Sequence, residues 1–311
     1  MELWFLYALG AAVFAGLTTI LAKIGIKDVD ANLATAIRTM VVIVFAWLMV
    51  FITGAGGGIW HISPFTWIFI ILSGLATGGA WLCRYRALKL GNVNKVTPIA
   101  KTSTILTMIL AFIFLGEPMG WYMIVTMVLI GAGTWLMLEL KKAGKPKDKD
   151  SGKGIKNTKG INAKGIIDAK GWLFFAVLAA VFASLVAILG RVGVADIDAT
   201  LWTALRTMVV ALLSWLMVFT TGHPRDIKTV NKKSWLFLVL SGIATGGSWL
   251  FFYHALQIGN ASLVVPIDQL SILLTMGFAR IFLGERFTRR SLLGLALLTT
   301  GILFPTIIGL L

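Results

Sequence analysis

The chain has 311 residues, of which 58% are hydrophobic, and its formal net charge is +15. Soluble domains contain about 45–50% apolar residues, so this composition excludes an ordinary soluble domain and favours a protein that lies in a bilayer. The positive charge does not indicate a nucleic-acid site, because such a site needs a folded basic face. A single cysteine, Cys83, excludes disulfides within the chain and any multi-cysteine metal site.

Ten apolar runs of about 20 residues follow one another along the chain, and each is long enough to cross a hydrocarbon core as an α-helix. The shorter alternating segments of a membrane barrel are absent from the sequence. In chain order the predicted spans are Leu3–Ala22, Leu33–Thr53, Phe65–Cys83, Val96–Leu115, Gly120–Leu138, Trp172–Gly190, Leu201–Thr221, Trp235–Phe252, Leu263–Leu283 and Ser291–Leu311. We therefore predict an all-α membrane protein with ten transmembrane helices.

The second half of the sequence repeats the first without insertions or deletions. Arg38 corresponds to Arg206, an offset of 206 − 38 = 168 positions, and the surrounding Ala-x-Arg-Thr-Met-Val-Val motif is shared. Five spans is an odd number, so the second copy must enter the membrane from the opposite side. Inverted repeats of this kind are typical of secondary transporters, whose substrate site lies between the repeats. We predict a first repeat at 1–140, a linker at 141–170 and a second repeat at 171–311.

The positions of lysine and arginine predict the orientation, because these residues favour the cytoplasmic side. Arg191 and Arg206 fall on the side that holds both termini, and the other basic residues fall on the side of the linker. The halves have also exchanged charges, as where Arg84 becomes Phe252. We predict a multi-pass protein of the cytoplasmic (inner) membrane, with both termini outside and the linker in the cytoplasm.

The linker at 141–170 is rich in Lys, Gly and Asp and has no aromatic residue. Such a segment buries too little surface to offset its ordering entropy, which favours a solvated tether. The alternative is that its lysines bind anionic lipid headgroups.

Taken together, the repeated motifs resemble the drug/metabolite transporter superfamily, specifically EamA-type proteins with two tandem five-helix domains. The residues that carry the resemblance are Arg38 and Arg206, the glycine-rich segments Gly74–Gly79 and Gly242–Gly247, Pro98 and Pro266, and Leu-Gly-Glu at 115–117 and 283–285. The resemblance implies alternating access around a central cavity lined by the first, third and fourth helices of each half. The chain departs from the family in its predicted orientation, since typical members begin their first half in the cytoplasm and this chain is predicted to begin outside.

A carboxylate within the ninth span is the first candidate for a role in transport, because charge at membrane depth is expensive. Asp268 is followed by Ser271 and Thr275 at i+3 and i+7, which gives one polar helical face. The equivalent face in the first half carries Ser103 and Thr107 but no carboxylate.

A lysine and a glutamine are also exchanged between the halves, since Lys101 corresponds to Gln269. One hypothesis is that Asp268 and Lys101 are charged gates at opposite mouths of the cavity. The alternative is that Lys101 extends to the headgroups while Asp268 caps the start of its helix.

Two aromatic pairs lie near the ends of the third and eighth spans, namely Trp81 with Tyr85 and Trp249 with Tyr253. They are either part of the interfacial aromatic belt or walls of the substrate cavity.

The glycine-rich third and eighth spans also contain the threonines Thr77 and Thr245, which we include among the candidate substrate-binding residues. Glycines such as Gly74 and Gly78 form small-xxx-small faces, which favours close helix packing over a backbone that lines the substrate.

Arg38 and Arg206 each follow a pair of aspartates, at 28 and 30 and at 196 and 198. This spacing favours a local ion-pair network over substrate binding. Glu117 and Glu285 follow a glycine at a helix end and precede the next helix, which is typical of helix capping.

No nucleotide-binding loop, metal-ligand cluster or nucleophile–base set is found in the sequence, so we predict no enzyme activity and no cofactor. The first span of each half lacks the carboxylate that couples export to protons in small multidrug resistance proteins.

The predicted function is a secondary transporter, an exchanger or facilitator, for a small polar or amphipathic metabolite. Its partners are that solute and the bilayer, and a monomer is sufficient because the two repeats replace a dimer. The alternative is an engineered or structural inverted-repeat fusion without transport activity. A passive channel is disfavoured because polar residues within the spans are sparse.

Overall fold

The computed structural model describes residues 3–25, 29–90, 99, 102–137, 163–221, 227, 230–282 and 288–309, and their secondary structure is helical. The first half contains α1 (Leu3–Gly25), α2 (Ala31–Thr53), the 3-10 helix η1 (Ala55–His61), α3 (Pro64–Leu90), α5 (Ser103–Leu115) and α6 (Trp121–Met137). The second half contains α7 (Ala163–Gly193), α8 (Ala199–Thr221), α9 (Lys232–Ile258), α10 (Ala261–Asp268), α11 (Ser271–Phe282) and α12 (Arg289–Gly309).

Capping residues set several of the helix boundaries. Asp30 accepts hydrogen bonds from two backbone N–H groups at the start of α2, and Asp198 does the same at the start of α8. Gly54 and Gly116, with φ of 71° and 64°, end α2 and α5 in the left-handed conformation that glycine adopts without strain.

The long helices confirm a membrane protein. Within the described residues, seven helices are long and apolar enough to cross a bilayer, and α5 and α6 contain shorter apolar segments. The ninth span is divided between α10 and α11 by a turn at Gln269 and Leu270, just after Pro266. The sixth span differs from prediction, because α7 begins at Ala163 inside the expected linker. Extending an existing helix costs little once its apolar part has formed.

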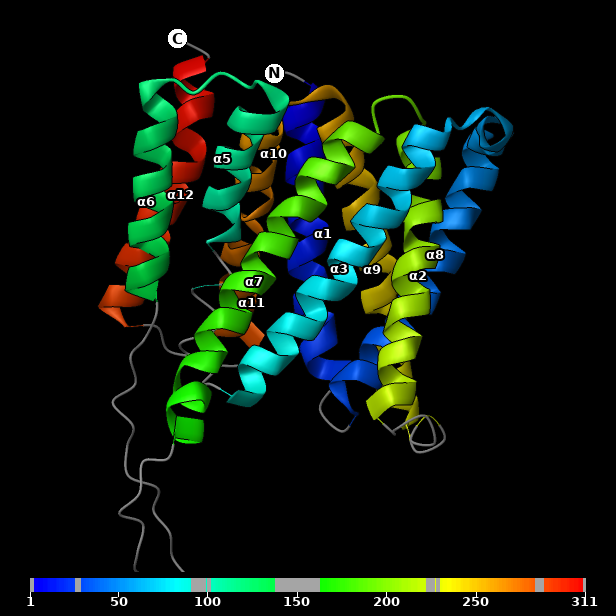
Figure 1. Ribbon diagram of the computed structural model, residues 1–311, viewed down its shortest axis with the longest axis horizontal. Helices are drawn as coiled ribbons and strands as arrows, with labels where there is room; N and C mark the ends of the chain where they lie inside the picture. Colours follow the sequence, from blue (N-terminus) through cyan, green and yellow to red (C-terminus); the bar gives the residue numbers. More distant parts are fainter. Residues whose placement is uncertain are drawn as a thin grey trace, which may run out of the picture.

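The two halves are inverted, as predicted (Figure 1). Both termini lie on one face, α1 runs away from that face, and α7 runs towards it. Helices pair across the halves: α1 packs on α9, α3 on α7, α2 on α8 and α6 on α12. The α6–α12 pair lies at one end of the molecule and the α2–α8 pair at the other, with the remaining spans between them.

Glycines on α3 and α9 allow these helices to approach their partners closely. A Cβ atom added at Gly74 would lie 2.6 Å from Cβ of Val209 in α8, and one at Gly78 would meet Leu213 as closely. On α9, Gly242 meets α2 in the same way. The packing interpretation of the small-residue faces is therefore confirmed at these positions.

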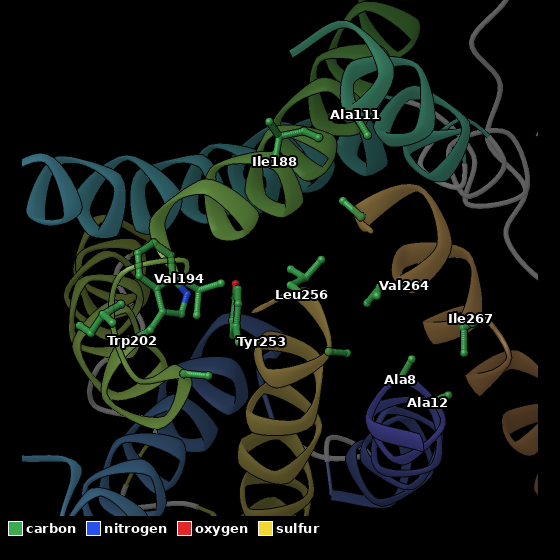
Figure 2. Close-up of a cluster of buried hydrophobic side chains, with 14 of the residues drawn as sticks. Ala8, Ala12, Ala111, Ile188, Val194, Trp202, Tyr253, Leu256, Val264 and Ile267 are labelled. Atoms are coloured by element: carbon green, nitrogen blue, oxygen red, sulfur yellow. The ribbon is translucent and has the colours of Figure 1, made fainter. Parts of the chain in front are cut away.

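A cluster of buried apolar side chains fills the space between the halves near the face that holds the termini (Figure 2). It includes Ala8 of α1, Trp202 of α8, Tyr253 and Leu256 of α9, and Val264 of α10, each at most 2% exposed. This packing closes the molecule at that end.

Candidate functional site

A buried arginine lies beneath this closed end. Arg206 is seven residues into α8, which places it about 10 Å along the helix axis. Only 2% of the residue is exposed. An arginine near the centre of a membrane helix costs about 2.5–3.5 kcal/mol on insertion scales, so a fully buried one is a functional candidate by default.

The Arg206 guanidinium contacts residues of two other helices. Its Nε donates to Ser73 Oγ at 2.9 Å, and its Nη2 donates to Thr77 Oγ1, both on α3. Its central carbon lies 5.0 Å from the ring centre of Trp249 and 5.2 Å from that of Tyr253, both on α9. The hydroxyls and the ring faces partly replace the water that the cation loses.

Two donors in this cluster are left without an acceptor. Arg206 Nη1 is buried and has no hydrogen-bond partner, and the same is true of Trp202 Nε1. Trp202 is one helical turn before Arg206 on α8, and its ring meets that of Tyr253 edge-on with centroids 5.9 Å apart. Figure 2 shows the indole nitrogen on the side of the ring that faces Tyr253.

The cluster is built from three pairs of residues spaced four apart. Ser73 and Thr77 lie on α3, Trp202 and Arg206 on α8, and Trp249 and Tyr253 on α9. Residues at i and i+4 lie on one face of a helix, so each helix presents a polar or aromatic face to the same point. We refer to these six residues as the Arg206 cluster.

A carboxylate ties the two halves together at the same end of the molecule. Glu117, which follows α5, is 7% exposed and accepts hydrogen bonds from the backbone N–H groups of Ala261 at 2.7 Å and Ser262 at 2.9 Å. These groups begin α10, where the helix dipole favours a negative charge. Glu117 therefore caps a helix, as its sequence position predicts, but the helix belongs to the other repeat.

A second set of hydrogen bonds joins the ends of α7 and α9. Arg191 Nη1 donates to the Gln257 carbonyl at 3.4 Å, and Gln257 Nε2 donates to the carbonyls of Val194 and Ile197 at 3.2 and 2.9 Å. Together with the Glu117 contact, these bonds hold the termini side closed over the Arg206 cluster.

The EamA-like transporter family matches the sequence twice, at residues 2–139 and 170–307. The chain belongs to this family. One solved crystal structure, described only as that of a protein, superposes on this EamA-like transporter with a TM-score of 0.77. The superposition covers 98% of this chain and 96% of the other at 18% sequence identity, so the likeness concerns the fold.

Two relatives have about the length of one repeat. An uncharacterized transporter from the cobO 3′ region of Sinorhizobium sp is 40% identical over 135 residues, which are 43% of this chain and 96% of the relative. An uncharacterized protein of Methanocaldococcus jannaschii is 26% identical over 105 residues, 31% of this chain and 77% of that relative. The similarity to such short proteins agrees with the internal duplication of the EamA-like transporter.

Among the residues predicted from sequence, Thr77, Trp249 and Tyr253 lie together in the Arg206 cluster. Tyr253 is 2% exposed, so it is not part of an interfacial belt. Trp81, the equivalent of Trp249 in the first half, is half-buried in α3, and the side chain of Tyr85 lies outside the described residues.

The predicted polar face of the ninth span is interrupted. Asp268 is the last residue of α10 and Gln269 lies in the turn that follows, both half-buried. Ser271 begins α11, and Thr275 donates to its carbonyl at 2.9 Å. Asp268 therefore ends α10 three positions before the first residue of α11, and the gate and capping hypotheses both stay predictions.

The first-half counterparts of these residues are only partly described. Ser103 begins α5, and Thr107 is 1% exposed and donates to the Ser103 carbonyl at 2.9 Å. Lys101, the proposed second gate, lies outside the described residues, as do Pro98 and Glu285.

Thr245, like its counterpart Thr77, donates to the carbonyl four residues before it, here that of Ser241 at 2.7 Å. The two differ in their second contact, since the Thr245 hydroxyl lies 3.4 Å from the hydroxyl of Thr18 in α1. Arg38, the counterpart of Arg206, is half-buried in α2.

The predicted local ion-pair network is wrong for Arg206, because Asp198 is used as the cap of α8 and the arginine side chain extends to α3 and α9. Sequence reasoning also missed Ser73 and Trp202 as site residues. The sequence did contain a signal for Trp202, because the two halves differ there: the equivalent residue of the first repeat is Ala34.

A lateral groove of about 590 Å³ lies between α2, α8 and α9 and is lined by apolar side chains alone, among them Met40, Phe45 and Trp235. Met40 and Trp235 are exposed on the apolar outer surface. The lining of this groove offers a polar solute no hydrogen-bonding group, so the Arg206 cluster remains the candidate site.

Proposed function

We propose that this EamA-like transporter is a secondary transporter, an exchanger or facilitator, that moves a small polar or amphipathic metabolite by alternating access. The observation that carries the proposal is that the Arg206 cluster is shared between the repeats. Ser73 and Thr77 come from the first half, whereas Arg206, Trp249 and Tyr253 come from the second. A movement of one half against the other therefore changes the access to the site, as alternating access around a site between repeats requires.

The contacts at the termini side support a state that is closed at that end. The Glu117 cap joins the first half to the second and must break for the halves to separate at this end. With both termini outside, as the lysine and arginine distribution favours, this state is closed to the exterior of the cytoplasmic membrane.

The proposal keeps the division of the chain at 1–140, 141–170 and 171–311, with the linker as a cytoplasmic tether. Because the site needs one repeat of each orientation, a single chain supplies both and a monomer is sufficient.

The experiment is solute exchange in proteoliposomes with the termini end locked. On a Cys83→Ala background, Glu117→Cys in the first half and Ser262→Cys in the second are introduced together and joined by a bifunctional methanethiosulfonate. We expect exchange of at least one solute in a metabolite panel, its loss on cross-linking, and its recovery after reduction. The two single-cysteine variants, treated with the same reagent, are the matched controls.

Two outcomes would contradict alternating access. Solute flux that is equally fast with and without the cross-link would indicate a passive pore. No exchange of any solute across a broad panel, by protein that is folded and reconstituted, would favour the structural fusion instead.

A further inference from the structure

The Arg206 cluster has an excess of hydrogen-bond donors and of positive charge. Arg206 is 2% exposed, and among the described residues no carboxylate forms an ion pair with it. Both of its described hydrogen-bond partners are neutral hydroxyls. Buried charges in proteins are normally paired, so a fully buried cation held only by hydroxyls and rings is incomplete.

The two open donors belong to side chains that contact the same ring, that of Tyr253. Arg206 Nη1 and Trp202 Nε1 both lack an acceptor. Because the residues are four apart on α8, their side chains leave the same face of the helix. Two N–H donors of which one is cationic match the two oxygens of a carboxylate.

We propose that the Arg206 cluster binds the carboxylate of a small amphipathic organic monoanion. The inference rests on the proposed transport function and names the chemical class of its substrate. One oxygen accepts from Arg206 Nη1 and the other from Trp202 Nε1. The apolar part of the solute lies against the aromatic faces of Trp249 and Tyr253.

The charge count favours a monoanion over a phosphate or a zwitterion. One arginine neutralises one negative charge, whereas a dianionic phosphate leaves a second charge buried without a partner. A zwitterion would bring its own cation next to Arg206 in an environment that screens charge poorly. The aromatic rings and neighbouring apolar residues such as Leu256 favour a solute with a hydrocarbon body.

The site is closed in this structure, so the anion reaches it when the halves move apart. Ser73 and Thr77 hold the guanidinium in place from the first half while the ligand is absent. These hydroxyls accept from Nε and Nη2, so the anion can bind at Nη1 without displacing them.

The test is equilibrium binding of radiolabelled benzoate and hexanoate to the full-length protein in lipid nanodiscs. We expect saturable binding of at least one probe below about 1 mM, and no competition by benzamide, which has the same body without the charge. Arg206→Gln should weaken binding at least about tenfold, because it removes the charge from a charge-assisted hydrogen bond.

Two further variants separate the site from a general loss of structure. Trp202→Phe keeps a ring and removes the N–H, and should weaken binding about threefold to tenfold. Arg38→Gln makes the same change in the other repeat and should leave the affinity within about twofold. If Arg206→Gln does not fold, Trp202→Phe and Arg206→Lys, which keeps the charge and loses the planar fork, still test the assignment.

The inference is overturned if neither probe binds at about 10 mM, if Arg206→Gln and Trp202→Phe bind like wild type, or if phenyl phosphate competes better than benzoate. Its failure is distinguishable from failure of transport. Arg206-dependent binding without exchange in proteoliposomes upholds the anion site and contradicts the transport proposal. Exchange of other solutes without carboxylate binding upholds the transport proposal and contradicts the anion site.

Discussion

Arg206 and Arg38 occupy equivalent positions in the two repeats, and their surroundings differ. Arg206 is fully buried between α3 and α9 and bonds to Ser73 and Thr77. Arg38 is half-buried on α2, although the equivalents of those two residues, Ser241 and Thr245, are present on α9. The same local sequence therefore produces a fully buried arginine with partners on two other helices in one half and a half-buried arginine in the other.

The difference is explained by residues on neighbouring helices. Thr18 of α1 accepts hydrogen bonds from two hydroxyls of α9. The Ser241 hydroxyl donates to the Thr18 backbone carbonyl at 3.1 Å, and the Thr245 hydroxyl donates to the Thr18 hydroxyl at 3.4 Å. The position equivalent to Thr18 in the second half is Val186, which keeps the backbone carbonyl but has no hydroxyl to offer Thr77. The surroundings of the two arginines therefore differ through residues outside their own motif.

The largest expected difference between the halves comes from removing the two hydroxyls that bond to Arg206, compared with removing the equivalent two hydroxyls on α9. Ser73→Ala with Thr77→Val should lower the free energy of unfolding by about 3 kcal/mol, because two charge-assisted bonds to a buried cation are lost. The matched change, Ser241→Ala with Thr245→Val, should cost about 1 kcal/mol, since neutral bonds between membrane helices average about 0.6 kcal/mol each. Unfolding in mixed micelles measures both, and equal costs would contradict the asymmetry.

The arginines themselves should differ in transport more than in stability. Arg206→Met should reduce benzoate exchange in proteoliposomes at least about 30-fold, equivalent to about 2 kcal/mol, because a buried charge partner is removed. Its thermal stability should be equal or higher, since an apolar side chain replaces a buried cation.

Arg38→Met is the matched control and should keep exchange within about twofold of wild type. A similar loss in both variants would mean that the two arginines contribute equally.

The closed end above Arg206 should open when the Glu117 cap is weakened. On a Cys83→Ala background, Ser262→Cys is introduced beneath the cap and labelled with a membrane-impermeant maleimide. Adding Glu117→Gln should raise the labelling rate about tenfold, or about 1.4 kcal/mol, because one acceptor and the charge at the start of α10 are lost. An unchanged rate would show that the cap does not control access from this end.

The smallest effect should come from the hydroxyl of Thr18. Thr18→Val removes the side-chain contact with Thr245 but keeps the backbone carbonyl of residue 18 as an acceptor for Ser241. The free energy of unfolding should therefore fall by only about 0.6 kcal/mol. Benzoate affinity should not change, because the side-chain contact of Thr18 is with Thr245, which is not part of the Arg206 cluster. A loss above about 2 kcal/mol would assign Thr18 a larger structural role than its contacts explain.

The sequence by itself determined the architecture of this protein. Hydropathy locates the spans because lipid forces each apolar segment to bond its own backbone, and the repeat with five spans requires inversion. That Glu117 caps a helix could also be predicted from its position after Gly116, but the sequence did not indicate which helix it caps. The predictable features are properties of segments or of neighbours along the chain, which need no contact between distant residues.

Tertiary structure alone decided which polar residues meet. Arg206 reaches Ser73 across 133 positions of sequence, and Glu117 reaches Ala261 across 144. Both contacts depend on how closely the helices pack, as at Gly74 against Val209, and on which neighbour competes for a hydroxyl. The local sequence around Arg206 and Arg38 is nearly the same, and it therefore suggested an ion-pair network at both. Packing between the repeats made one of them a buried cation with an open donor, because the helices that surround each arginine differ.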